Sequence, residues 1–160
     1  MVATSAGAGR ESPRSLRKLG TAWVGLALAF AIHVTDEALT GFLSVYNPTV
    51  QVSRAELGFW PMPTLEFRAW LGGLIAGVIV LLALSPFVFR GARWIRPIFY
   101  FLAIVAGLLN AFGHTVGTIF GQTVSTVHFP RPAPGFYSSP LLVIAAVYAL
   151  MQLRRTRGGM

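Results

Sequence analysis

The ionisable residues inside the long apolar stretches of this chain are those whose types and spacing could do chemistry. In the first stretch, His33 precedes Asp36 by three residues and Glu37 by four. In a helix, this spacing places both carboxylates on the same face as His33. In a later stretch, Asn110 and His114 are four residues apart and share a face in the same way. Two imidazoles and a carboxylate are a common ligand set for zinc or ferrous iron, with a position left open for water.

A divalent metal, zinc or iron, would give each of these residues a role. We expect His33, Glu37 and His114 to be the metal ligands, and Asp36 to act as the catalytic acid or base. Asn110 is expected to support the bound cofactor by orienting His114. Two other interpretations stay open: a hydrogen-bonded polar plug that fixes helix packing, and a path or pocket for a proton, an ion or a polar ligand.

The absence of cysteine and the position of the third histidine limit which residues can form a metal site. The chain contains no cysteine, so no thiolate can bind a metal or attack a substrate. His128 lies among prolines in an apparent loop and is expected to be a solvated residue. Any metal site must therefore use His, Asp, Glu or neutral oxygen atoms.

The composition places these residues in a membrane. Of the 160 residues, 54% are hydrophobic and 11% are charged, whereas a soluble domain has about 25% charged residues. The net charge of +8 would suit nucleic acid, but the basic residues cluster between long apolar runs, as in the cytoplasmic segments of membrane proteins. We expect a multi-pass protein of the bacterial plasma membrane. Its expected partners are membrane lipids and an apolar or lipid substrate, and no nucleic acid is expected.

The predicted fold class is all-α, a four-helix transmembrane bundle. Asn47-Pro48 is expected to end the first span, and Thr64 to cap the second with Glu66 in its first turn. The basic start and first apolar run also fit a signal peptide, but no small-x-small cleavage site follows, so an uncleaved helix is favoured. The predicted segments are a disordered basic N-terminus at 1–18, spans at about 20–46, 65–89, 97–121 and 137–153, and a basic tail at 154–160.

Basic residues predict the orientation of the spans. Ten lie in segments 1–18, 90–96 and 154–160, and three lie in the two remaining loops. This bias places both termini and the middle loop in the cytoplasm. The polar residues of the first and third spans then lie roughly 18 to 24 Å from the cytoplasmic edge, at one level in a core about 30 Å thick. We expect the two helices to pack together with those residues facing each other.

Glycines recur on the third predicted helix. Gly113, Gly117 and Gly121 are spaced by four residues, which is expected to let another helix approach closely. Gly73 and Gly77 on the second helix are the expected partners.

Two short motifs resemble a known family. The segment His33-Val34-Thr35-Asp36-Glu37 resembles the H-x-x-E-E signature of the HXXEE family of small integral membrane proteins, with aspartate replacing its first glutamate. The segment Asn110-Ala111-Phe112-Gly113-His114 resembles that family's N-A-x-x-H motif. The family also has a Y-x-P-G motif, to which the segment starting at Tyr137 is similar in place, with one extra residue and Leu141 in place of glycine. The resemblance makes Tyr137 a candidate cofactor-binding residue, and it names no reaction.

The sequence favours a metal-dependent membrane enzyme that acts on a lipid or other apolar substrate entering from the bilayer. The alternative is a small non-enzymatic membrane protein that carries a proton, an ion or a ligand through the same polar site. A carrier needs a polar route toward both faces of the membrane. Residues 21–32 and 98–109 contain no Asp, Glu, His, Lys or Arg, which argues mildly against a carrier.

Overall fold

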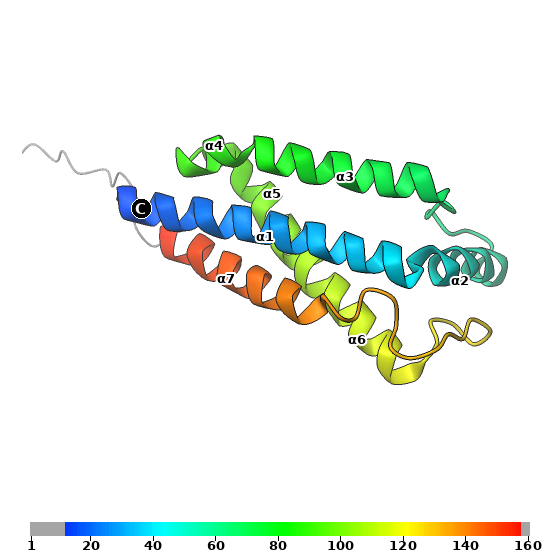
Figure 1. Ribbon diagram of the computed structural model, residues 1–160. Coiled ribbons are helices and arrows are strands. Elements are labelled where there is room, and N and C mark those ends of the chain that lie inside the picture. Colours follow the sequence, from blue (N-terminus) through cyan, green and yellow to red (C-terminus); the bar gives the residue numbers. More distant parts are fainter. Residues whose placement is uncertain (1–11, 158–160) are drawn as a thin grey trace, which may run out of the picture.

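The structure of the chain is a computed structural model that describes residues 12–157 (Figure 1). Helices dominate that range, and its one pairing of extended backbone is an isolated bridge between Gln122 and His128. The predicted all-α class is therefore confirmed. In chain order the elements are α1 (Pro13–Thr40), α2 (Phe42–Leu57), α3 (Phe67–Ala83), α4 (Ser85–Phe89), the 3-10 turn η1 (Arg93–Ile95), α5 (Arg96–Phe101), the π-helix η2 (Leu102–Leu109), α6 (Asn110–Phe120) and α7 (Ser139–Arg157).

Three helical stretches of the described chain are long and apolar enough to cross a membrane. They are Pro13–Thr40, Phe67–Phe89 and Arg93–Phe120, and they correspond to the first three predicted spans. The fourth predicted span, 137–153, forms most of α7, a helix of 19 residues that ends in arginines and is not among the three.

Helix α1 lies in the middle of the molecule, between α3 and α7, with α5 to α6 crossing it (Figure 1). The hydrophobic core forms where these helices meet. Trp23 of α1 is its largest fully buried side chain; the indole nitrogen donates to the carbonyl of Leu81 at 2.7 Å, and the ring meets Phe99 edge-on with centroids 5.0 Å apart. Leu142 and Leu153 of α7 close the core from the other side. This core holds α1 and α6 in the positions that build the polar site.

The first helix begins and ends earlier than predicted. It starts at Pro13, within the segment predicted as disordered, because the Ser12 side chain accepts from the backbone of Ser15 and proline suits the first helical position. It ends at Thr40, because Gly41 adopts the left-handed conformation, with φ 79°. The rest of the predicted disordered segment, residues 1–11, lies outside the described residues.

Pro48 does not end a helix, contrary to the prediction. Helix α2 starts after the break at Gly41 and continues through Pro48 to Leu57, into the predicted loop. Asn47 fixes α2 to the approach to α3, since its side-chain amide donates to the carbonyl of Leu65 and accepts from the amide of Leu65, each at 2.9 Å. These tertiary bonds outweigh the local tendency of Asn-Pro to end a helix.

The helices of the second and fourth predicted spans, α3 and α7, also differ from the prediction at one end. Glu66, not Thr64, is the N-cap residue of α3, and its carboxylate accepts from the backbone amide of Ala69 at 2.8 Å. A carboxylate is a stronger acceptor than a hydroxyl at this position. Helix α7 continues to Arg157, into the predicted tail, and residues 158–160 lie outside the described part.

The glycines of α6 do not form the predicted close contact with another helix. A Cβ at Gly117 would lie 3.4 Å from Ala133 and Phe129 of the following loop, and a Cβ at Gly113 would have nothing within 4 Å. Gly73 and Gly77 also have open space around them. The predicted close approach of the second and third spans through glycines is therefore wrong, and Gly117 faces the 121–138 loop instead.

Candidate metal centre

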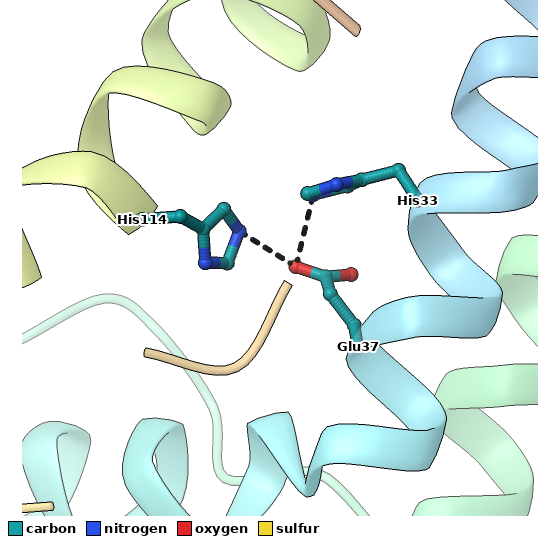
Figure 2. A group of neighbouring side chains, drawn as sticks. All are labelled: His33, Glu37 and His114. Carbon is teal, nitrogen blue, oxygen red and sulfur yellow. Dashed lines mark hydrogen bonds and ion pairs between the residues drawn. The ribbon is translucent and has the colours of Figure 1, made fainter. Parts of the chain in front are cut away.

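Helices α1 and α6 bring His33, Glu37 and His114 into one buried cluster (Figure 2). Each residue offers one ligand atom, and the three atoms lie within 4.8 Å of one another. Glu37 Oε1 is 3.1 Å from His114 Nε2 and 3.5 Å from His33 Nε2, and the imidazole centroids are 4.8 Å apart. The exposed fractions are 0%, 5% and 7% in chain order. The expectation that the polar residues of the two helices face each other is confirmed.

Asn110 is part of the site but contacts the other histidine. Its side-chain amide donates to His33 Nε2 at 2.9 Å, whereas we expected it to orient His114. Asn110 is the first residue of α6, one turn before His114, and His33 is one turn before Glu37 on α1. The two helices therefore pair their polar residues in two levels, Asn110 with His33 and His114 with Glu37.

Asp36 bonds outside the cluster. Its carboxylate accepts from the backbone amide and from the hydroxyl of Ser138, both at 2.8 Å. Successive residues of an α-helix point about 100° apart, so a helix that aims Glu37 at α6 aims Asp36 elsewhere, here toward the start of α7. Asp36 reaches His33 only through Ser138, whose oxygen lies 2.8 Å from His33 Nδ1.

These bonds assign the tautomer of His33. An ionised carboxylate only accepts hydrogen bonds, so the single hydroxyl proton of Ser138 points to Asp36. His33 Nδ1 must then be the donor to the Ser138 oxygen. The lone pair of His33 is consequently on Nε2, the atom that faces Glu37. A second partner that holds a histidine in this way is usual for histidines that bind metals.

Gly135 covers the cluster from the 121–138 loop. Its φ is +80°, and a Cβ built on it would lie 2.8 Å from His114 Cε1 and 2.9 Å from Glu37 Cγ. Its amide donates to the Thr40 hydroxyl at 3.0 Å, and its carbonyl accepts from the Ser139 hydroxyl at 2.8 Å. Only a residue without a side chain can approach the ligands this closely.

Sequence reasoning missed Gly135 and Ser138. The available signals were a glycine in a proline-rich loop and a serine next to the predicted start of the last helix. Tyr137, which the resemblance suggested, has a side chain that is 69% exposed and packs on Phe136, so the structure does not bring it to the cluster. His128 is exposed, as expected.

A hollow of about 240 Å³ lies beside the cluster. Asn110 and His114 line its polar end, and apolar side chains of α2, η2, α6 and the following loop, including Phe42, line most of the rest. Leu109 and Gly113 also line it and are exposed on the surface of the candidate span Arg93–Phe120. The hollow thus connects the buried cluster with the lateral surface of the bundle.

The chemistry of the cluster is that of a group that could hold a metal ion. Its donor atoms come from three side chains on two helices, and they converge without any cysteine. With three protein ligands, a further position would remain for water or substrate. No protein-family model, curated protein or solved structure matches this chain.

Proposed function

We propose that the chain is a metal-dependent membrane enzyme, in which His33, Glu37 and His114 bind zinc or ferrous iron. The observation that carries the proposal is the convergence of three ligand atoms within 4.8 Å, buried between two candidate membrane spans. The polar-plug alternative explains the facts less well. Neutral amides would join two helices with less desolvation than a carboxylate and two imidazoles.

The tautomer of His33 leaves Nε2 without a proton, as a metal ligand requires. His33 Nε2 carries a lone pair and lies 3.5 Å from Glu37 Oε1, which is also an acceptor. That lone pair accepts from Asn110, and a cation bound by Nε2 would replace this hydrogen bond, because an imidazole nitrogen has one lone pair. The converging residues are those of the two motifs that resemble the HXXEE family, and the proposal extends to membership of that family.

A metal bound here would act as a Lewis acid or would supply an activated water. Residues of the chain would hold its ligands in place: Ser138 bonds to His33 Nδ1, and Gly135 covers His114 and Glu37. The bond of Asn110 to His33 Nε2 would give way to the metal. The bonds of Asp36 support a positioning role through Ser138 over the acid or base role expected from the sequence.

The proposal is tested first on the wild-type protein, purified without a histidine tag and incubated with zinc, iron and manganese. About one metal ion per chain should remain after excess metal is removed, as measured by mass spectrometry of the metals. Lipid extracts of cells that express the wild type should also contain a changed species that is absent from cells with Glu37→Gln. A wild type without metal would favour the polar plug or the carrier.

Four spans with both termini in the cytoplasm are the topology that we propose. The start of α1, helix α4 and the end of α7 lie at one end of the molecule (Figure 1), and the described residues of the three basic clusters belong to that end. Reporter fusions at Gly91 and after Arg157 should report a cytoplasmic location, and a fusion at Pro134 the opposite side. A fusion after Arg157 that reports the outer side would contradict four spans.

Ser138→Ala should weaken metal binding without unfolding the protein. The substitution removes the hydroxyl between Asp36 and His33, and loss of a partner that orients a metal-binding histidine costs about 10- to 100-fold in affinity. Titration against a metal chelator measures the change. Ser139→Ala is the matched control, because that hydroxyl also bonds the Gly135 carbonyl but does not contact His33. Equal losses in both variants would show that the effect comes from the loop alone.

The hollow beside the cluster supports an apolar substrate. A water-sized group occupies about 30 Å³ of liquid, so about 240 Å³ takes roughly eight such groups. That is enough for a polar end group near His114 and the first carbons of a chain. The exposed rim at Leu109 lets the rest of a lipid stay in the bilayer.

Gly113→Leu should block the hollow and leave the metal site intact. A Cβ at Gly113 meets nothing within 4 Å, so leucine fits on the helix and its side chain occupies the hollow. Labelling of the hollow by a photoreactive diazirine fatty acid should fall to background, while metal content stays at the wild-type level. Gly72→Leu makes the same change at another open position, on α3. Undiminished labelling of Gly113→Leu would contradict this substrate path.

The carrier alternative has less support in the structure. Between the cluster and the basic end of the molecule, α1 and the third span are packed in the hydrophobic core around Trp23 and Phe99. A proton or an ion that left the cluster toward that end would meet apolar side chains.

A further inference from the structure

A second cleft lies at the basic end of the molecule, far along α1 from the candidate metal ligands. It has a volume of about 320 Å³ and forms between the first turns of α1 and the last turns of α7. Arg14 and Lys18 line it from α1, and Arg155 lines it from α7. The remaining lining side chains carry hydroxyls or an amide, and none of the described side chains that line the cleft is acidic. The cleft is therefore suited to an anion.

The positive charge in the cleft comes from side chains that the two helices place together. Arg14 and Lys18 are four residues apart, so they share one face of α1. The positive end of the α1 dipole and the negative end of the α7 dipole lie side by side and oppose each other. The attraction for an anion thus depends on the three cationic side chains.

Gln152 adds a hydrogen-bonding side chain to the cleft. Its side chain lines the cleft and the residue is only 4% exposed, yet no residue in the described range 12–157 forms a hydrogen bond with its amide. The amide is not among the fully buried side-chain atoms without a partner in the described chain, so it is accessible from the cleft. Its two N–H groups can donate to the oxygen atoms of an anion in the cleft.

The position of the cleft indicates the source of the anion. The cleft adjoins the start of the candidate span Pro13–Thr40, the part of a spanning helix that would meet the lipid headgroups. Arginine and lysine are the usual partners of phosphate groups, and cytoplasmic leaflets are rich in anionic lipids. We infer that this cleft binds the phosphate of one anionic lipid headgroup, held by Arg14, Lys18, Arg155 and the Gln152 amide. This inference does not depend on the metal site.

The test measures binding of dioleoylphosphatidylglycerol to the full-length protein in detergent by native mass spectrometry. The wild type should retain one lipid tightly, and dioleoylphosphatidylcholine should bind more weakly. Lys18→Gln and Arg155→Gln should each weaken binding about fivefold, the factor expected for one basic residue near a membrane surface. Gln152→Leu should weaken binding without any change in charge.

Matched controls come from the neighbouring residues. Arg17→Gln and Arg154→Gln remove the same charge from the same turns, but neither residue lines the cleft, so both variants should bind like the wild type. Equal losses in all four charge variants would overturn the inference in favour of diffuse surface charge. If an equal concentration of inorganic phosphate displaced the lipid, the inference that the bound anion is a lipid headgroup would be wrong.

Discussion

Purified His114→Ala protein should contain no stoichiometric metal, whereas the wild type should contain about one ion per chain. His114 supplies one of three ligand atoms and is the only one of the three ligands that α6 contributes. Its loss leaves two ligands on one helix, which is too few to hold zinc or iron against a chelator. The measurement is the metal content of tag-free protein after incubation with zinc, iron and manganese.

His128→Ala is the matched control for this variant. It removes the same side chain from an exposed position outside the cluster, so it should bind metal like the wild type. Far-ultraviolet circular dichroism should show the same helix content for both variants and the wild type. Full metal content in His114→Ala would contradict the proposed ligand set.

Gly135→Ala should abolish metal binding and also reduce the stability of the protein. The left-handed conformation at φ +80° costs a residue with a side chain about 1 to 2 kcal/mol. The new methyl group would also lie within 3 Å of His114 and Glu37, so the loop must move away or the ligands must separate. Thermal unfolding and metal titration measure the two effects.

Gly58→Ala separates backbone strain from contact with the ligands. Gly58 has a similar φ of +68°, and a Cβ there meets nothing within 4 Å. This variant should lose about 1 kcal/mol of stability and keep its metal. If the two glycine variants bound metal equally well, Gly135 would not be the cover of the site.

The meeting of α1 and α6 could be predicted from the sequence because two strong constraints act on it. Helical periodicity places His33 and Glu37 on one face, and the fixed thickness of a membrane places His114 at a matching depth. Composition and hydropathy identified the helices themselves. These constraints apply only to regular segments of the chain.

The remaining parts of the site come from segments without such constraints. Gly135 and Ser138 lie in or beside a loop, where neither periodicity nor depth indicates which residues approach the cluster. The break at Gly41 was missed because glycine is also common within membrane helices, whereas the proline at position 48 looked like the stronger signal. The tertiary bonds of Asn47 kept α2 helical through that proline.

The π-helix η2 has a consequence for the angular phase of the third span. Each π turn uses almost one residue more than an α turn, so η2 shifts the phase of every side chain that follows it. Within η2, the span presents a small residue, Gly107, to Ala146 of α7. After the shift, it presents Asn110 and His114 to α1. One span thereby contacts two neighbours, α7 through Gly107 of the π-helix and α1 through Asn110 and His114 of the α-helix that follows it.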